Sequence, residues 1–552
     1  MIEERVPVEV LVIGAGMAGG AISCTLAEAG VDVMCLEQGE WIPGARRPHE
    51  SRYYELDRAF SWNTAPNTRS WDVDYPIGTE TLQPLMLNAV GGSTAVYTAA
   101  WPRFRPTDFY KDDEHGKSPN WPYSYEDLAP YYAENDRSMG VSGLAGDPAM
   151  PPHEEYPNPP LPLGKRGRKF MEGCDALGWH SWPFPMAVNS REYGGRPACN
   201  FCGNCQSGCA RNSLAGTHNT YWPRALKAGA KLETGSRVER VVTDETGSAT
   251  GVVFVDKARG ERYYQPADKV VICCNGIGTP RLLLNSANEQ HPNGLANSSD
   301  EVGRNLMFHG LAFVEAWTDE VLEPHKGVAC AAAFTEEFAE TDTERGFLNG
   351  FTLLCSGMNG PGYQALGSHS GNVAPWGKDH HKWFDDHFSK GFTILVQTED
   401  LPHPNNRVTL DPTLTDSDGL PAPHVSYSLH PNDEALIDYA CERAQELAAA
   451  VGAHDIKVNR FFDADGNYKP PAWHLMGTAR MGDDPATSVT DGEHRAWDVP
   501  NLYICDGSSF PTGGAVNPTS TIGAMALKCA DGILRHLGRP VRTDRTLELL
   551  GN

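Results

Sequence analysis

Residues 8–20 read Val8-Glu9-Val10-Leu11-Val12-Ile13-Gly14-Ala15-Gly16-Met17-Ala18-Gly19-Gly20. This stretch predicts a buried strand that turns through glycines into a helix from Ala21 to Gly30, followed by a second strand that ends at Glu37. Gly14 allows the tight turn, Gly16 lets the backbone approach a pyrophosphate, and Gly19 lets the helix pack on the strand. Glu37 then stands where it can accept a hydrogen bond from a ribose hydroxyl. The pattern predicts a dinucleotide-binding βαβ unit; the alternative is a unit whose glycines serve only packing.

Length and charge limit the classes of function. The 552 residues suffice for at least two domains with an ample core. The 46 basic and 71 acidic residues give a net charge of −25, which argues against nucleic acid or an anionic membrane as a partner. No uncharged apolar run reaches membrane-spanning length. Because the acidic start leads straight into the first strand, we expect no signal peptide and a cytoplasmic protein; export with a signal-bearing partner subunit is the alternative.

Two patterned segments near the C-terminus carry candidate catalytic residues. His474 belongs to the run Trp473-His474-Leu475-Met476-Gly477, and Asn517 follows Gly513-Gly514-Ala515-Val516. A histidine that titrates near neutrality is a good base for removing a hydroxyl proton. An amide beside it can hold the same oxygen while charge develops there. Alone, either residue is more often structural, and the pair gains weight from the dinucleotide motif at the other end of the chain.

These segments resemble the glucose–methanol–choline (GMC) family of FAD-dependent alcohol oxidoreductases over nearly the whole chain. The other segments that carry the resemblance are Asn88 to Thr94, Trp121 to Leu128, Val270 to Leu284, and Val302 to Leu306 with His309. The resemblance implies that the dinucleotide is FAD. It also implies that His474 is the catalytic base and that Asn517 contacts the same substrate oxygen.

The resemblance further implies an α/β protein, α+β overall, with a Rossmann-like FAD-binding domain. An interleaved substrate-binding domain, built on an antiparallel sheet, is expected to cover the flavin. We expect the discontinuous FAD-binding domain to comprise residues 1–110, 226–309 and 466–552, and the cover domain to comprise residues 110–225 and 310–465.

Further cofactor contacts are implied in the same way. Besides Gly14, Gly16, Gly19 and Glu37, the expected cofactor-binding residues are Gly91, Gly92, Ser93, Val238, Asp506, Pro518 and Thr519. Some relatives attach FAD through a histidine just after the glycine turn. Here that stretch reads Ser93-Thr94-Ala95-Val96-Tyr97, so we expect non-covalent FAD.

A strand predicted at residues 392–400 carries candidate substrate contacts. Its alternation places Thr393, Leu395, Gln397 and Glu399 on one face. Gln397 and Glu399 are candidates for binding sugar hydroxyls beneath the flavin; the alternative is a half-exposed sheet face.

Four of the fourteen cysteines lie within eleven residues, namely Cys199, Cys202, Cys205 and Cys209. Their C-x2-C-x2-C-x3-C spacing is that of bacterial iron–sulfur loops, although the proline that usually follows is absent. A zinc site and a thiol or disulfide loop without metal are the alternatives. The loop also resembles that of the sugar and gluconate dehydrogenase branch, which implies electron transfer to a cytochrome or a small partner subunit; oxygen is the other acceptor.

Together these features favour oxidation of a carbohydrate or glycoside secondary alcohol to a ketone, by hydride transfer to flavin. Two alternatives stay open. One is an oxidase of a non-sugar alcohol of the choline or sterol type, and the other is a non-enzymatic flavin protein that relays electrons.

Overall fold

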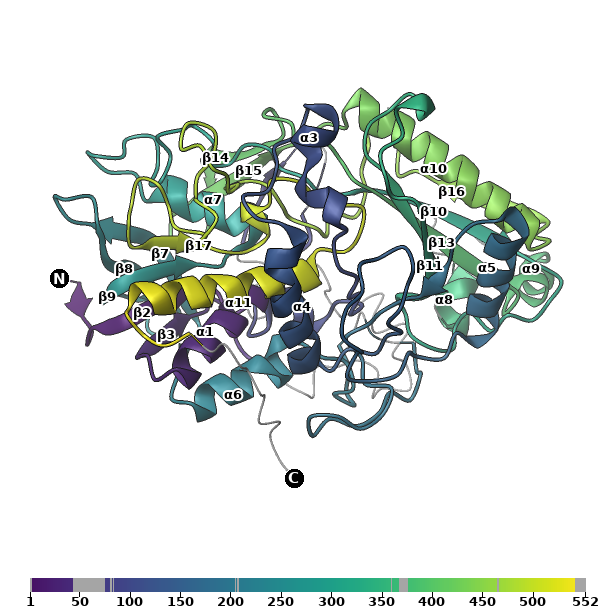
Figure 1. Ribbon diagram of the computed structural model, residues 1–552, viewed down its shortest axis with the longest axis horizontal. Helices are drawn as coiled ribbons and strands as arrows, with labels where there is room; N and C mark the ends of the chain where they lie inside the picture. Colours follow the sequence, from purple (N-terminus) through teal and green to yellow (C-terminus); the bar gives the residue numbers. More distant parts are fainter. Residues whose placement is uncertain are drawn as a thin grey trace.

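The structure, a computed structural model, describes residues 2–42, 75–79, 82, 84–203, 205, 208–358, 360–366, 376–463 and 466–541. Two large sheets organise these residues and lie towards opposite ends of the longest axis (Figure 1). The chain crosses between the two sheets more than once and returns to the first near its C-terminal end.

An eight-stranded sheet forms the region that contains the N-terminus. Its strands are β1 (Glu3–Glu4), β2 (Val8–Ile13), β3 (Val33–Leu36), β6 (Lys231–Glu233), β7 (Ser236–Thr243), β8 (Ala249–Asp256), β9 (Glu261–Ile272) and β17 (Leu502–Ile504). The order is β6-β3-β2-β9-β8-β7, and both β1 and β17 also pair with β9. The pairs among β6, β3, β2, β9 and β17 are parallel, which confirms the predicted Rossmann-like sheet.

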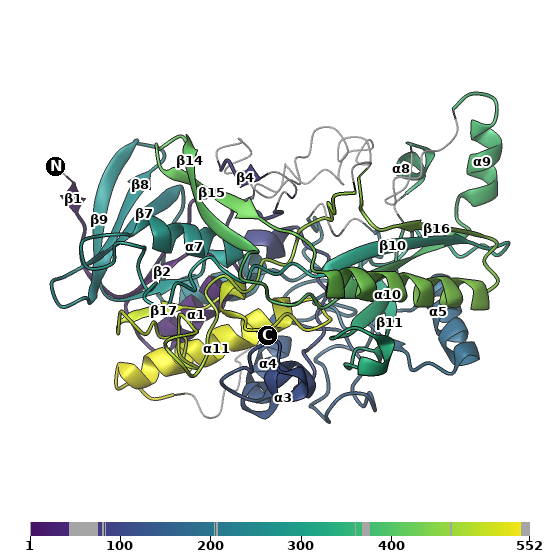
Figure 2. The same cartoon turned by 90° about the horizontal axis from the view of Figure 1, so that it is seen from above.

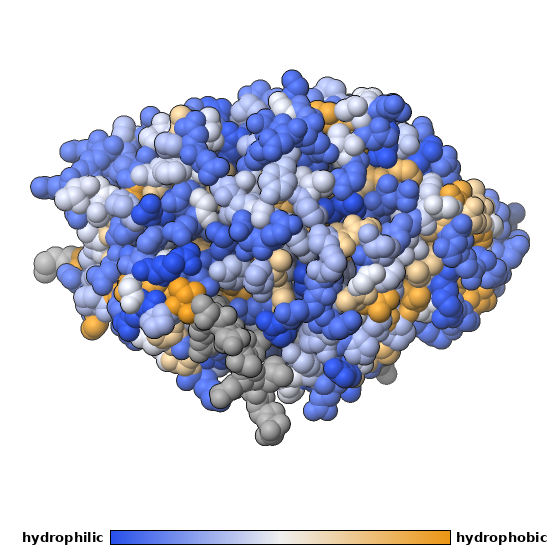
Figure 3. Space-filling model, viewed as in Figure 1, coloured by the Kyte–Doolittle hydropathy of each residue, from blue (hydrophilic) through white to orange (hydrophobic). Residues whose placement is uncertain are grey.

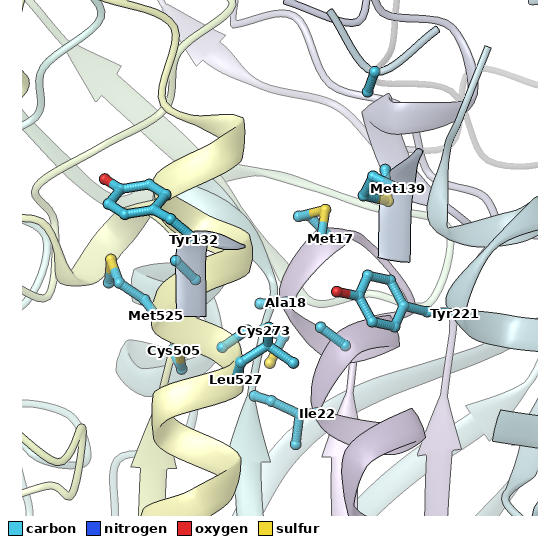
Figure 4. Packing of buried hydrophobic residues seen from close by; sticks show 14 of the residues in the cluster. Met17, Ala18, Ile22, Tyr132, Met139, Tyr221, Cys273, Cys505, Met525 and Leu527 are labelled. Atoms are coloured by element: carbon cyan, nitrogen blue, oxygen red, sulfur yellow. The ribbon is translucent and has the colours of Figure 1, made fainter. Parts of the chain in front are cut away.

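The helices of this region include α1 (Met17–Glu28), α4 (Tyr125–Met139), α6 (Tyr221–Lys227), α7 (Asn275–Asn285) and α11 (Thr519–His536). Helix α1 packs against α11, and apolar side chains such as Ile22 and Leu527 fill the space between them (Figure 4). Full burial of an Ile side chain stabilises the fold by about 1.5–3 kcal/mol. The helix starts at Met17, earlier than the predicted Ala21, because the turn is already complete at Gly16.

A six-stranded sheet forms the second region. Its order is β16 (Asp455–Asn459), β10 (Gly310–Trp317), β13 (Gly391–Thr398), β12 (Phe351–Ser356), β11 (Ala331–Phe338) and β5 (Trp182–Pro183). Every pair is antiparallel, as predicted for the cover over the flavin. The helices α10 (Pro431–Ala450) and α5 (Gly164–Leu177) pack on this sheet (Figure 2).

Strand β13 shows the alternation that the sequence predicts. Ile394 and Val396 are fully buried in the core that the sheet shares with Leu436 of α10. Thr393, Leu395 and Gln397 point to the other side, towards a large cavity. One face of the strand therefore stabilises the fold, and the other is available to a ligand.

Smaller elements complete the described fold. A three-stranded sheet consists of β14 (Arg407–Thr415), β15 (Pro421–Ser426) and β4 (Gly78–Thr79). The short helices are η3 (Gly92–Ala95), η4 (Pro106–Phe109), α3 (Lys111–His115), η6 (Thr217–Asn219), η7 (Thr343–Arg345), α8 (Pro361–Leu366), α9 (His380–His387) and η8 (Gly507–Ser509).

The surface is largely polar on the face shown in Figure 3, where hydrophobic residues form scattered spots. Within the described ranges, no helix is both long enough and apolar enough to cross a membrane.

Candidate active site

A cavity of about 870 Å³ is lined by both large sheets. The turn after β2 and the end of β3 form one end, and β10 and β13 contribute to the other. Most of the predicted cofactor residues line it, namely Gly14, Gly16, Glu37, Gly92, Ser93, Val238, Asp506, Pro518 and Thr519. His474, Asn517 and Gln397 line the same cavity, whereas Gly19, Gly91 and Glu399 do not.

The glycines of the first turn are required by close contacts. Gly14 has φ +97°, and a Cβ there would lie 2.5 Å from the carbonyl oxygen of Cys273. At Gly19 a Cβ would lie 1.8 Å from the carbonyl oxygen of Gly14, so Gly19 is a packing position, as predicted. Gly16 is different, because an added Cβ would meet no described atom within 4 Å. Gly16 also starts α1 without a side-chain cap, so the first amides of the helix are available to a phosphate.

The second glycine turn packs directly on the first. The Gly91 amide donates to the Ala15 carbonyl at 2.9 Å, and a Cβ on Gly92 would lie 3.0 Å from Gly16 Cα. Gly91 therefore supports the first turn instead of lining the cavity. Ser93 lines the cavity, and its hydroxyl accepts a hydrogen bond from the Leu87 amide at 3.2 Å.

Glu37 is buried at the end of β3, and the backbone holds both of its carboxylate oxygens. Oε2 accepts a hydrogen bond from the Ala15 amide, and Oε1 accepts one from the Gly39 amide, each at 2.8 Å. Burial raises the pKa of Glu37 to about 7, although these hydrogen bonds oppose the shift. Because each carboxylate oxygen has a second lone pair, the oriented side chain can still accept a hydrogen bond from a ribose hydroxyl.

Asp506 is held in a similar way at the start of η8. Its Oδ2 accepts hydrogen bonds from the Asn275 amide at 2.9 Å and the Thr279 hydroxyl at 2.7 Å. Its Oδ1 accepts one from the Ser508 amide at 2.7 Å. This network ties β17 to the start of α7 on the cavity wall.

His474 lies between His309 and Asn517. The two Nδ1 atoms of His474 and His309 are 2.7 Å apart, and His474 Nε2 is 3.1 Å from Asn517 Nδ2. Two hydrogen bonds between the backbones of Met307 and Met476, each at 3.1 Å, hold the segments of the two histidines together. Sequence reasoning assigned no role to His309, although it belongs to a segment that carries the family resemblance.

The hydrogen bonds of His309 determine which nitrogen of His474 is free. His309 Nε2 faces the carbonyl oxygens of Gly513 at 3.1 Å and Gly514 at 2.7 Å, which can only accept, so this nitrogen carries a proton. In the neutral ring, His309 Nδ1 is then an acceptor, and the proton between the two rings belongs to His474 Nδ1. His474 Nε2 is therefore unprotonated and can accept a proton from an alcohol.

The sequence predicts a base at position 474 that titrates near neutrality. In the structure, burial, with a further contribution from His309, lowers the pKa of His474 well below its ordinary value. Burial also lowers the pKa of His309. Both rings are therefore neutral at physiological pH, the state in which His474 Nε2 is unprotonated.

A buried ion pair holds His309 in place indirectly, through the backbone of Gly514. Lys111 Nζ is 3.3 Å from Glu399 Oε2, and Glu399 Oε1 accepts a hydrogen bond from the Gly514 amide at 3.2 Å. The Gly514 carbonyl in turn accepts from His309. Asp400, the next residue, accepts from the backbone amides of both Phe308 and His309 at 2.9 Å. Glu399 thus holds the Gly514 backbone and does not line the cavity, unlike Gln397.

The four clustered cysteines form no metal site in the described part of the chain. There, no group of three or more His, Cys, Asp or Glu side chains is arranged to hold a metal ion, and no disulfide joins the described cysteines. The cysteine loop borders the cavity, because Gly203 lines it. The loop is also held by a backbone hydrogen bond, in which the Phe201 carbonyl accepts from the Gly327 amide at 3.0 Å.

Comparison with known proteins agrees with the fold and the cavity. Two family models, both described as GMC oxidoreductase, match residues 8–311 and 402–526. The fold and these family matches define an oxidoreductase that acts on alcohol groups. The chain belongs to the GMC oxidoreductase family, and the glycine turns, Glu37 and Asp506 fit the FAD of that family.

Individual relatives extend this result over almost the whole chain. The chain is 46% identical to a 2-methyl-1,2-propanediol dehydrogenase of Mycolicibacterium austroafricanum, over 96% of this chain and 95% of the relative. It is 30% identical to a fructose dehydrogenase large subunit of Gluconobacter japonicus, over 97% and 99%. In fold it is similar to a pyridoxine 4-oxidase from Mesorbium loti, with a TM-score of 0.63, 18% identity and coverage of 96% and 99%.

Proposed function

We propose that this protein oxidises a secondary alcohol of a carbohydrate or glycoside to a ketone, using non-covalently bound FAD. A second candidate substrate is a small 1,2-diol, favoured by the relative at 46% identity that is named as a diol dehydrogenase. The observation that carries the proposal is the arrangement of His474, whose unprotonated Nε2 accepts a hydrogen bond from Asn517 Nδ2 at 3.1 Å within the cavity.

His474 and Asn517 have complementary roles in this mechanism. When bound, FAD accepts a hydride from the carbon that bears the hydroxyl. His474 Nε2 takes the hydroxyl proton, because the contact with His309 leaves this nitrogen unprotonated. The Asn517 amide donates to the substrate oxygen as negative charge develops there. His309 holds the base in the required tautomer.

In the proposal, different residues hold different parts of the dinucleotide. The amides at the start of α1, with Gly14 and Gly16, hold the pyrophosphate, and Glu37 accepts from a ribose hydroxyl. Val238 offers its backbone to the adenine, and Gly92, Ser93, Asp506, Pro518 and Thr519 surround the flavin half. Attachment is non-covalent, and flavin that stayed on the protein after acid precipitation would contradict this.

The electron acceptor is either oxygen or a protein such as a cytochrome or small subunit. The relative named as a large subunit favours a partner. A cluster on Cys199, Cys202, Cys205 and Cys209 remains a prediction without geometric support in the described residues. Iron and acid-labile sulfide, measured per flavin after anaerobic purification, test it. A cytoplasmic location also remains a prediction.

Anaerobic bleaching of the flavin by a panel of alcohols tests the proposed function. The panel contains a glycoside, fructose, a 1,2-diol, choline and a sterol. We expect the glycoside, the sugar or the diol to bleach the flavin rapidly. Bleaching by choline or the sterol alone would support a non-sugar oxidase, and FAD that no alcohol bleaches would support the electron-relay alternative.

A further inference from the structure

We infer that Gln397 forms a subsite for a second, non-reacting hydroxyl group of the substrate, so that the enzyme selects vicinal diols over mono-alcohols. The inference rests on the proposed function and makes it more specific. It starts from an amide whose hydrogen-bonding groups have no use within the described fold.

Gln397 is fully buried, with 0% of its surface exposed, and it lines the cavity. Neither its Oε1 nor its Nε2 has a hydrogen-bond partner among the described residues. Buried amides without partners are costly, and almost all such groups in proteins are satisfied. An unsatisfied amide that faces a ligand cavity is therefore a candidate contact for a polar group of the ligand.

The strand register places Gln397 opposite a residue that lies close in sequence to His309, the residue that positions the base. Gln397 pairs with Leu311 across β10 and β13, and Leu311 is two residues after His309. Directly opposite residues in such a pair have Cβ atoms about 4.5–5.5 Å apart. Gln397, His474 and Asn517 also line the same cavity, so a ligand held by the last two can present a second hydroxyl to the amide. Asn517 Oδ1 is also buried without a partner in the described structure.

The surrounding wall restricts the chemistry of the ligand. The residues that β10 and β13 contribute to the cavity are neutral, namely Leu311, Phe313, Thr393, Leu395 and Gln397. An amide both donates and accepts hydrogen bonds, and so does a hydroxyl group. The nearest carboxylate on this strand end, Glu399, is occupied by Lys111. The site therefore fits an uncharged neighbouring hydroxyl better than a quaternary ammonium group.

Thr393 extends the same face of β13. Thr393 is buried, with 1% of its surface exposed. Its hydroxyl has no hydrogen-bond partner among the described residues. It lies four residues from Gln397, about 13 Å along the strand, with Leu395 between them. The wall thus offers a hydroxyl contact near the reaction centre and another farther away, which a small diol does not reach.

A pair of substrates with the same carbon skeleton tests the subsite. Anaerobic flavin reduction is measured by stopped flow with 1,2-propanediol and with 2-propanol, which share the secondary alcohol and differ only in the second hydroxyl, for wild type and for Gln397→Met. Methionine keeps the length of the side chain and removes its amide. We expect the substitution to lower the apparent second-order rate constant for the diol by about 100-fold and that for 2-propanol by less than about threefold.

A matched control uses the opposite face of the strand. Ile394→Val alters β13 on the side that packs in the core, and it should retain the wild-type preference for the diol. FAD content and thermal unfolding check that each variant is folded. If Gln397→Met does not fold, the diol preference of the wild type and of Gln397→Asn provides the test.

The outcomes separate this inference from the proposed function. Equal losses with 1,2-propanediol and 2-propanol, or a wild type without a diol preference, would overturn the subsite while leaving the oxidation itself in place. Flavin that is reduced by neither of these two substrates nor by the wider alcohol panel would overturn the proposed function instead.

Discussion

The two ends of the cavity differ in how their polar groups are satisfied. At the dinucleotide end, the carboxylates of Glu37 and Asp506 accept hydrogen bonds from the protein itself. At the end formed by the antiparallel sheet, the Gln397 amide has no partner in the described structure. The first end is thus oriented before any ligand arrives. The second end has polar groups that only a ligand or water can satisfy. The difference indicates that cofactor binding uses general features of backbone and glycine turns, and that selectivity for the substrate depends on a few side chains.

The largest expected effect is that of removing the base, which should abolish most of the flavin reduction without affecting cofactor binding. His474→Ala should lower the rate of flavin reduction by roughly 10²–10⁴, because no group remains to take the hydroxyl proton. Bound FAD should be unchanged, since His474 makes no contact with the dinucleotide end. Stopped-flow reduction and the flavin-to-protein absorbance ratio measure the two effects. Comparable activity in the purified variant would refute the assignment of the base.

His309 offers a sharper variant of the same experiment. His309→Leu removes the acceptor for the Nδ1 proton of His474 and should lower flavin reduction by about 100-fold. His309→Gln is the matched control, because an amide can donate to the Gly514 carbonyl and accept from His474. We expect flavin reduction in His309→Gln to be at least about tenfold faster than in His309→Leu. Equal rates in both variants would mean that His309 acts only by packing.

The buried ion pair should have a smaller effect on the same rate. Glu399→Gln removes the charge that pairs with Lys111, which loosens the hold on the Gly514 backbone and so on His309. We expect flavin reduction to slow by about tenfold, with FAD still bound. Glu114→Gln is the control, since Glu114 contacts Lys111 at 3.1 Å from the surface side and should change the rate less than about twofold.

At the dinucleotide end, Glu37→Gln should weaken FAD binding by about fivefold, the effect of losing one hydrogen bond. The new amide group places a donor opposite the Ala15 or Gly39 amide, both of which are donors. Glu9→Gln is the control, because Glu9 accepts from the Asp32 amide in the same βαβ unit without lining the cavity. Titration of apoprotein with FAD measures the affinity. A loss of reduction rate in the fully reconstituted variant would break the separation of the two ends.

The smallest expected effect is the pH dependence of the wild type. The reaction needs unprotonated His474, and its pKa is lowered well below the ordinary value by burial and His309. Activity is therefore retained above that lowered pKa and lost only as the pH falls through it. We expect His474 itself to contribute no pH dependence between about pH 6 and pH 8. A decline in this window should follow the protonation of Glu399, whose pKa burial raises to about 7, and should be absent from Glu399→Gln. A decline near the ordinary pKa of histidine that persists in Glu399→Gln would show that His474 is more exposed to solvent than the structure indicates.

The sequence predicted those parts of the site that depend on local patterns. Gly14, Gly16 and Glu37 line the cavity because glycine turns and strand ends have local geometric requirements. Gln397 faces the cavity because it belongs to a regular strand. Glu399 does not, and the reason is that β13 ends at Thr398, so that alternation no longer fixes the direction of its side chain.

Other parts depend on contacts between distant segments, which spacing does not reveal. The roles of Lys111 and His309 arise from side chains that meet across more than a hundred residues of sequence. The cysteine spacing likewise predicted a metal loop, but spacing does not give the distances between the four sulfur atoms. In the described residues those thiols form no metal-binding group.

The parallel pairing of β2 with β9 and of β9 with β17 also bears on how the chain is made. During synthesis the first strand leaves the ribosome long before its partner β9, and β17 and α11 come near the end. Contacts of such long sequence separation slow folding and leave apolar strands exposed for longer. The FAD cavity, which needs Asn517, Pro518 and Thr519, is therefore complete only after nearly the whole chain has been translated. A nascent chain that already contains the glycine motif has no finished pocket for its cofactor.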